Sequence, residues 1–331
     1  MESAGLSMRL FGFLALALVT PFAIGAGEIL ELVATIPMPN VKGRIDHFAA
    51  DVKGHRLYVA ALGNDTVEVL DTAHNRHEKS IPGFGEPQGL IYIPETQRLY
   101  VASGSADRVD ILDGRSFAPV RQIGKLADAD NVRYDAGARK MVVGYGKGAL
   151  RMLDPSTGES QGDIPLSGHP ESFELEQNGD RIFVNVPTAR HIAVVGRTKR
   201  AVIATWDVSA RSNFPMALDE KGRRLFVGTR SPAALLVHDI ESGREVAKLK
   251  MAGDIDDIFF DGERGRIYAI CGEGQVDVFR QESPDRYVRE ARVRTAPRAR
   301  TGLLVPEEGK LYVAAPAVGS TPARVLVYAV R

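Results

Sequence analysis

A five-residue motif recurs along this chain at a nearly constant interval. RLYVA occurs at 56–60 and again at 98–102, and five related segments follow it. Each copy, here called an anchor, begins with a basic residue, and these residues are Arg56, Arg98, Lys140, Arg181, Arg224, Arg266 and Lys310. The intervals between them are 42, 42, 41, 43, 42 and 44 residues. Seven copies at one period predict a repeat architecture.

A period of about 40–50 residues with several short strands per unit is typical of a β-propeller, in which each repeat forms one four-stranded blade. A single blade cannot bury both of its faces. Burial of apolar surface contributes roughly 25 cal/mol per Å², and this gain is complete only when the blades close into a ring. We therefore predict an all-β fold for residues 27–331, a seven-bladed β-propeller with four-stranded antiparallel blades.

Each repeat divides into four predicted strands, a to d. An apolar strand a precedes each anchor, as at 47–51, and the anchor is strand b. Strand c alternates apolar and polar residues, as in TVEVLD at 66–71, and strand d is more polar, as at 245–250. Four c strands end in an aspartate that is expected to accept backbone N–H groups in the next turn: Asp71, Asp113, Asp154 and Asp239. Glycines between strands a and b are expected to supply a positive φ: Gly54, Gly137, Gly179, Gly222, Gly265 and Gly309.

The last repeat lacks a strand d of its own. Its c strand, VLVYAV, occupies 325–330. The segment ILELVATIP at 29–37 has the pattern of a d strand and precedes the first strand a. We predict that this N-terminal strand completes the last blade, which closes the ring and leaves no open sheet.

Residues 1–26 have the pattern of a signal peptide. Arg9 precedes the apolar run LFGFLALALVTPFAIGA, which ends in small residues near Ala26. Pro21 and Gly25 interrupt this run, and it is short for a membrane span, so a membrane anchor fits less well. We expect a periplasmic or secreted mature chain without a membrane span.

Charge and motif content exclude several classes of function. The chain has 42 basic and 42 acidic residues and no net charge, which argues against general binding to nucleic acid or to anionic membranes. No serine-elbow motif, P-loop, CxxC or HExxH occurs in the sequence. Cys271 is the only cysteine, and we expect it to be a small buried residue rather than a nucleophile. The expected partner is a small molecule or a protein segment, and the expected oligomeric state is a monomer.

The anchors RLYVA and KLYVA, each followed by a turn and a strand similar to TVEVLD, resemble the repeats of the YVTN-type, or YncE-like, β-propeller family. The likeness covers residues 29–331. It implies an exported seven-bladed propeller. It does not imply a particular activity.

Alignment of the repeats on their anchors places polar residues at equivalent positions. In a propeller the chain enters strand a beside the central channel, so the preceding residues are expected to surround one mouth of that channel. Ten positions before the anchors stand Asp46, Gln88, Asp130, Glu171, Phe214, Asp256 and Arg300. Nine positions before them stand His47, Gly89, Asn131, Ser172, Pro215, Asp257 and Thr301. The predicted ligand-binding residues are Arg44, Asp46, His47, Gln88, Asp130, Asn131, Glu171, Phe214, Asp256, Asp257 and Arg300.

Three interpretations of this mouth stay open. Its carboxylates repel one another unless a positive group lies among them. Ca²⁺ or Mg²⁺ would suit the carboxylate and amide oxygens, whereas His47 with His169 would suit Zn²⁺. The candidate metal ligands are Asp46, Glu86, Asp130, Asn131, Glu171 and Asp256. A cationic or zwitterionic ligand, held by the acids with Arg44 and Arg300, is the second interpretation, and turn capping without any ligand is the third.

The pattern favours a non-enzymatic exported binding protein whose acidic channel mouth holds a small ligand or a partner segment. The only cofactor that the pattern indicates is a divalent cation, Ca²⁺, Mg²⁺ or Zn²⁺, and the binding protein needs none. The alternative function is a metal-dependent lactone or ester hydrolase, because the segment GEPQG resembles the E-G-P start of the gluconolactonase-like propellers. That resemblance implies metal ligands at Glu86, Asn131 and Asp256. It implies His47 or Glu171 as the general base.

Overall fold

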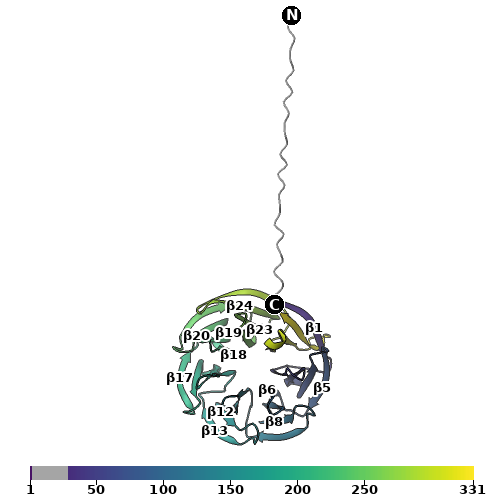
Figure 1. Cartoon of the computed structure of the whole chain (residues 1–331), viewed down its shortest axis with the longest axis vertical. Helices are drawn as coiled ribbons and strands as arrows, with labels where there is room; N and C mark the ends of the chain where they lie inside the picture. The colour runs from purple at the N-terminus through teal and green to yellow at the C-terminus, as the bar shows by residue number, and fades with distance from the viewer. Residues whose placement is uncertain (2–28) are drawn as a thin grey trace.

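The structure is a computed structural model that describes Met1 and residues 29–331. Within these residues, twenty-eight strands form seven four-stranded antiparallel sheets around one axis (Figure 1). The predicted seven-bladed propeller is therefore confirmed. The predicted signal peptide at 1–26 lies almost wholly outside the described residues. No helix in the described part of the chain is long and apolar enough to cross a membrane.

Blades 1 to 3 are each built from four consecutive strands, numbered from the channel outward. Blade 1 contains β2 (Phe48–Asp51), β3 (Arg56–Ala61), β4 (Thr66–Asp71) and β5 (Arg76–Pro82). Blade 2 contains β6 (Pro87–Ile93), β7 (Arg98–Ser103), β8 (Arg108–Asp113) and β9 (Pro119–Gly124). Blade 3 contains β10 (Val132–Asp135), β11 (Lys140–Tyr145), β12 (Ala149–Leu153) and β13 (Ser160–Pro165).

Blades 4 to 6 repeat this order. Blade 4 contains β14 (Phe173–Leu175), β15 (Arg181–Val186), β16 (His191–Gly196) and β17 (Ala201–Asp207). Blade 5 contains β18 (Arg211–Asp219), β19 (Arg224–Ser231), β20 (Ala233–Asp239) and β21 (Glu245–Lys250). Blade 6 contains β22 (Ile255–Asp261), β23 (Arg266–Cys271), β24 (Gln275–Ser283) and β25 (Arg286–Arg294). Residues 29–331 also contain three short 3-10 helices: η1 (Leu62–Asn64), η2 (Pro187–Ala189) and η3 (Pro306–Glu308).

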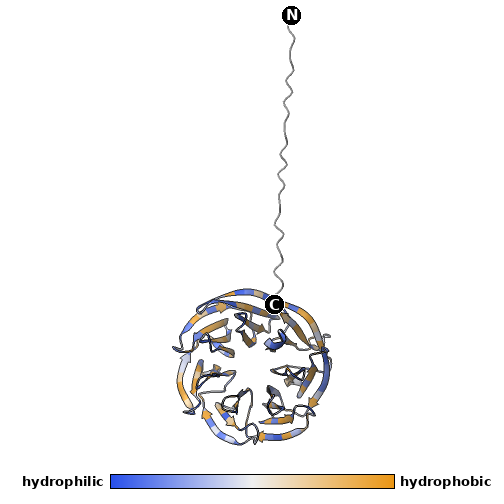
Figure 2. Cartoon of the chain, in the orientation of Figure 1, coloured by the Kyte–Doolittle hydropathy of each residue, from blue (hydrophilic) through white to orange (hydrophobic). Residues whose placement is uncertain are grey.

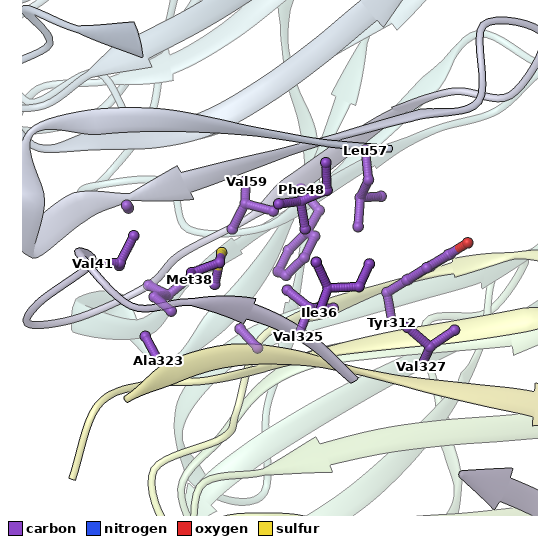
Figure 3. Packing of buried hydrophobic residues seen from close by; sticks show 14 of the residues in the cluster. Ile36, Met38, Val41, Phe48, Leu57, Val59, Tyr312, Ala323, Val325 and Val327 are labelled. Atoms are coloured by element: carbon purple, nitrogen blue, oxygen red, sulfur yellow. The ribbon is translucent and has the colours of Figure 1, made fainter. Parts of the chain in front are cut away.

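Blade 7 joins the two ends of the described chain. Its strands are β26 (Gly302–Val305), β27 (Lys310–Ala315), β28 (Ala323–Val330) and, outermost, β1 (Leu30–Met38). β1 pairs antiparallel with β28, with Ile36 opposite Val325, and a register shift separates Leu32 from Ala34. The predicted closure by the N-terminal strand is confirmed. In Figure 3 the side chains of β1 lie between the first blade and the last.

The hydrophobic core is divided into seven clusters, one between each pair of neighbouring blades. The third anchor residue is a fully buried aromatic in six blades: Tyr58, Tyr100, Phe183, Phe226, Tyr268 and Tyr312. Cys271 is fully buried in the cluster between blades 5 and 6, where burial raises the pKa of its thiol. The outer strands are more polar, and β5 is largely hydrophilic in Figure 2. The anchors therefore supply the surface that each blade buries against its neighbours.

The turns between strands a and b differ from the expectation at four of the six glycines. Only Gly265 and Gly309 have a positive φ. In blade 1 the positive φ, 53°, belongs to His55, whereas the Gly54 N–H donates to Asp51 Oδ1 at 3.0 Å. A Cβ atom on Gly54 would lie 2.2 Å from Asp51 Oδ2. The expectation for Gly54, Gly137, Gly179 and Gly222 was wrong, and at Gly54 glycine is needed because a carboxylate approaches its backbone closely.

The aspartates at the ends of the c strands accept backbone N–H groups, as the sequence predicts. Asp71 Oδ1 accepts from Ala73 at 3.0 Å and from His74 at 3.1 Å. The same arrangement occurs at Asp113, Asp154 and Asp239. These carboxylates are structural parts of the c–d turns.

The Asp71→Asn variant is expected to lose stability in a pH-dependent way. Partial burial acts to raise the pKa of Asp71, but hydrogen bonds from His74 and Arg76 outweigh it and hold the pKa at about 2. Because this pKa is lower in the folded chain, the ionised carboxylate stabilises the fold above about pH 4, and its contribution is lost as the pH falls towards about 2. Urea unfolding should therefore show a difference between wild type and variant that shrinks on acidification. A difference that stays constant with pH would contradict this role.

Candidate functional site at the channel mouth

In blades 1, 3 and 4 the two residues before strand a already pair with strand b of the same blade. The Asp46 N–H donates to Ala60 O at 2.8 Å, and the Ala60 N–H donates to His47 O at 3.0 Å. The same reciprocal pair joins Asp130 and Asn131 to Gly144. Equivalent bonds link Glu171 and Ser172 to Asn185. This extension of the backbone ladder holds the predicted ring positions at the start of the channel.

On one side of the mouth, carboxylates and histidines from blades 1, 3 and 4 converge. Potential ligand atoms of Asp46, His47 and Asp130 lie within 4.8 Å of one another. The same limit holds for Asp130, His169 and Glu171, so Asp130 belongs to both groups. We call these five residues the histidine cluster. His169, which the sequence analysis named with His47 as suited to Zn²⁺, lies in the loop between β13 and β14 and reaches Asp130.

Both histidines of this cluster are oriented through Nδ1. His169 Nδ1 lies 2.6 Å from Gly146 O, and because a carbonyl oxygen only accepts, this nitrogen carries the hydrogen. His47 Nδ1 lies 3.1 Å from Asp257 Oδ1, while Asp257 Oδ2 accepts the Gly302 N–H at 2.8 Å. The Nε2 atoms are left for the cluster, and His169 Nε2 lies 3.5 Å from Asp130 Oδ2.

The negative charges of the cluster shift the pKa values of its members. Burial by itself would lower the pKa of His47, but Asp257 and Asp46 outweigh it and raise the pKa to about 10. Burial opposes the same effect at His169, whose pKa is raised by Asp130. Burial and the charge of Asp130 raise the pKa of Glu171. The acids of the cluster therefore raise the pKa of both imidazoles above the ordinary value of histidine.

On the other side of the mouth, three arginines compensate two aspartates. Arg230 Nη2 donates to Asp256 Oδ1 at 2.5 Å, and Arg300 Nε lies 2.9 Å from Asp256 Oδ2. Arg300 Nη1 also donates to Asp254 Oδ1 at 3.0 Å. Arg44 lies 3.8 Å from Asp256 and donates to Asp46 at 3.1 Å. We call Arg44, Arg230, Asp254, Asp256 and Arg300 the arginine cluster.

The arginine cluster changes the charge of the mouth. Burial and the charge of Asp46 raise the pKa of Asp256, against the opposing effect of the three arginines. Arg230 also packs its guanidinium 4.2 Å from the centre of the Phe214 ring. Arg230 was not among the predicted residues. The mouth is consequently less acidic than its ring positions indicated.

Two cavities lie along the channel beside this mouth. The larger, of about 310 Å³, is lined by residues of blades 1, 2, 3, 4, 6 and 7, among them His47, Ile91 and Leu303. The smaller, of about 240 Å³, is lined by residues of blades 3 to 7. The two cavities share four lining residues: Arg133, Glu174, Asp257 and Phe259. Since strands a of all seven blades contribute to one cavity or the other, both belong to the central channel.

The predicted residues outside these clusters have other surroundings. Asn131 Oδ1 accepts from Arg133 Nη1 at 2.9 Å, close to the channel. Gln88 is half-buried on β6 beside Gly104. Glu86 is exposed, and its backbone bonds to Asp65 at 2.9 Å and Gly104 at 3.0 Å. The structure brings neither Gln88 nor Glu86 into either cluster.

The sequence analysis missed three channel residues that stand seven positions before their anchors: Arg133, Glu174 and Phe259. Because successive side chains of a strand point to opposite faces, positions nine and seven share a face. Alignment of the residues seven positions before the anchors, in addition to those nine before, would have identified all three. No such signal marks Arg230, which lies near the far end of β19. His169, which the sequence analysis did name, lies in a loop between blades at no ring position.

Comparisons with known proteins support the fold. The sequence matches no family model and no curated protein. A chain of hydrazine synthase from Kuenenia stuttgartiensis is similar with a TM-score of 0.73 and 15% identity, over 88% of this chain and 98% of that one. A chain of a mitotic checkpoint complex is similar with a TM-score of 0.78 and 12% identity, over 98% of this chain and 99% of that one. At these identities the likeness shows the fold alone.

Proposed function

We propose that this chain is an exported β-propeller binding protein, of the YVTN type that its anchors resemble, and that it holds a small zwitterionic ligand in its channel. The observation that carries the proposal is the pair of cavities that share Arg133, Glu174, Asp257 and Phe259. Ligand sites are concave, largely apolar and fitted with a few convergent polar groups. The larger cavity has a volume of about 310 Å³, which is suitable for a small molecule.

The lining residues indicate the ligand's chemistry. Arg133 supplies positive charge, and Asp257 and Glu174 supply carboxyl groups around the same space. Arg133 Nη2 lies 4.0 Å from Glu174 Oε1, too far for a direct hydrogen bond, so both groups keep capacity for a ligand. Apolar side chains such as Ile91, Leu303 and Phe259 form much of the remaining wall. A molecule with both charges and a short apolar part would satisfy this lining.

Export is part of the proposal and rests on the apolar run before Ala26, which lies outside the described residues. The hydrolase alternative receives less support. Its implied ligand Glu86 is exposed outside both clusters, and Asp256 is held by Arg230 and Arg300. Asn131 accepts a hydrogen bond from Arg133. The implied metal ligands therefore do not form one set.

Filling the channel is expected to abolish ligand binding. Ala49 lines the larger cavity and Ala217 the smaller, so Ala49→Trp and Ala217→Trp would each place an indole in the ligand's space. We expect the affinity for a panel of amino acids and betaines to fall at least about tenfold, or about 1.4 kcal/mol, by calorimetry. Ala201→Trp, at an exposed position of β17, is the matched control. The proposal fails if no panel member binds the wild type, or if both filled channels bind as the wild type does.

A further inference from the structure

We propose that the histidine cluster binds one divalent transition-metal ion of the Zn²⁺ class. Its ligands are Nε2 of His47, Nε2 of His169 and the carboxylates of Asp130 and Glu171. This site lies at the mouth of the channel that the preceding proposal fills with an organic ligand. The metal site goes beyond that proposal, because side chains of the protein alone coordinate the ion and no organic ligand is required.

Asp130 carries the first part of the argument. Its side chain is only 9% exposed, yet among the described residues its only side-chain hydrogen bond or ion pair is with His169 Nε2 at 3.5 Å. That distance exceeds the 2.7–3.2 Å of ordinary hydrogen bonds, whose modes lie at about 2.9 Å. A buried carboxylate without a close partner is costly unless a positive group approaches it. Asp130 is also the one residue common to both groups of potential ligand atoms.

The orientation of the two histidines is the second, independent observation. A metal-binding histidine usually donates its other ring N–H to a carboxylate or a backbone carbonyl, which directs the free nitrogen at the metal. His169 does so through Gly146 O at 2.6 Å, and His47 does so through Asp257 Oδ1 at 3.1 Å. Both outer partners lie outside the histidine cluster. His169 therefore presents Nε2 towards Asp130 from a fixed direction, and the contact at Nδ1 leaves Nε2 of His47 available to a metal ion.

The donor set selects the class of metal. Two imidazole nitrogens with two carboxylates suit Zn²⁺ and related transition metals, whereas Ca²⁺ and Mg²⁺ prefer oxygen ligands alone. Ligand atoms around tetrahedral Zn²⁺ lie about 3.5 Å apart, given metal–ligand distances near 2.1 Å. Ligand atoms lie within 4.8 Å of one another inside each of the two groups, and Asp130 joins the groups. The four assigned ligands come from both groups, so a metal ion at Asp130 would draw His47 towards His169 and Glu171.

The neighbouring carboxylates of the mouth are excluded by their partners. Both oxygens of Asp46 accept from Arg44 Nη2, at 3.1 and 3.2 Å. Asp256 is enclosed by Arg230 and Arg300. A metal ion at these positions would have to displace a guanidinium. The two carboxylates of the histidine cluster that have no arginine partner within residues 29–331, Asp130 and Glu171, are the ones assigned to the metal.

The test uses the purified chain after treatment with a chelator. Calorimetry with Zn²⁺ should show one equivalent bound, and Co²⁺ should give the visible absorption of a site with nitrogen ligands. Asp130→Asn and His169→Gln should each weaken Zn²⁺ binding at least about 100-fold, since loss of an outer partner alone typically costs about 10–100-fold. His191→Gln is the matched control, because His191 contacts Ser167 at 3.0 Å outside the cluster and should not alter binding.

Three results would overturn the proposal. These are absence of stoichiometric Zn²⁺ binding, wild-type affinity in both Asp130→Asn and Glu171→Gln, and equal affinity for Ca²⁺ or Mg²⁺. If Asp130→Asn does not fold by circular dichroism, Glu171→Gln and His169→Gln decide the question. Binding of amino acids and betaines to the same samples reports separately on the channel, so failure of one proposal is distinguishable from failure of the other.

Discussion

A chain that lacks residues 29–38 is expected not to form the propeller. This deletion removes β1, the outer strand of blade 7, and exposes the backbone edge of β28. It also takes Leu30 from the interface of blades 6 and 7, and Ile36 and Met38 from the interface of blades 7 and 1. Because each blade is stabilised by its two neighbours, loss of one closing strand weakens the whole ring.

Point variants in β1 test whether its buried side chains stabilise the fold, apart from the backbone pairing of the strand. Ile36 is fully buried against both end blades (Figure 3), so Ile36→Ala is expected to lower the free energy of unfolding by about 2–5 kcal/mol. Leu32 and Val33 are 51% and 47% exposed on the same strand. Leu32→Ala and Val33→Ala should therefore change the free energy of unfolding by less than about 0.5 kcal/mol.

Urea unfolding followed by circular dichroism measures these effects. The closing role of β1 would be refuted by a truncated chain that unfolds cooperatively at the wild-type midpoint. It would also be refuted if Ile36→Ala were as mild as the two surface variants. Rescue of the truncated chain by a synthetic peptide covering 29–41 would show directly that the strand acts through pairing with β28.

Replacement of Asp257 by alanine is expected to lower the free energy of unfolding by about 3 kcal/mol. Replacement by asparagine, described below, is expected to cost less. Asp257 extends from blade 6 to two other blades at the channel. It accepts the buried Gly302 N–H of blade 7 at 2.8 Å and contacts His47 Nδ1 of blade 1 at 3.1 Å. Alanine leaves a buried donor without an acceptor and His47 without its counter-charge.

Asp257→Asn is the control for this effect. An amide oxygen still accepts the Gly302 N–H, so only the charged contact with His47 is lost, and we expect a cost of about 1 kcal/mol. Chemical unfolding of the wild type and both variants at neutral pH gives the comparison. Equal stabilities of the two variants would mean that the bond to Gly302 contributes nothing, contrary to the structure.

The architecture was predictable because the pattern of apolar and polar residues in each repeat shows which side chains are buried. The anchors, the alternating c strands and the polar d strands reflect which side chains face a neighbouring blade, and the period fixes how often this occurs. Even the closure was visible, since 29–37 has the pattern that blade 7 lacks. The φ values of Gly54 and Gly222 were not predictable in this way. They depend on a carboxylate, at Asp51 and Asp219, that folds back onto the turn.

The convergence of Asp46, Asp130 and Glu171 followed from counting back from the anchors, because equivalent positions in a ring of blades face one axis. Their partners did not follow. His169 reaches Asp130 from a loop, and Arg230 reaches Asp256 from β19, at positions that no other repeat occupies in the same way.

The amino-acid sequence by itself determined the number of blades, their strands and the ring positions Asp46, Asp130 and Glu171, because these are local patterns repeated at one interval. Only the tertiary structure decided which carboxylates are neutralised by arginine and which face histidine. That choice depends on contacts between side chains from different blades. The distances between these side chains cannot be inferred from the sequence of any single repeat.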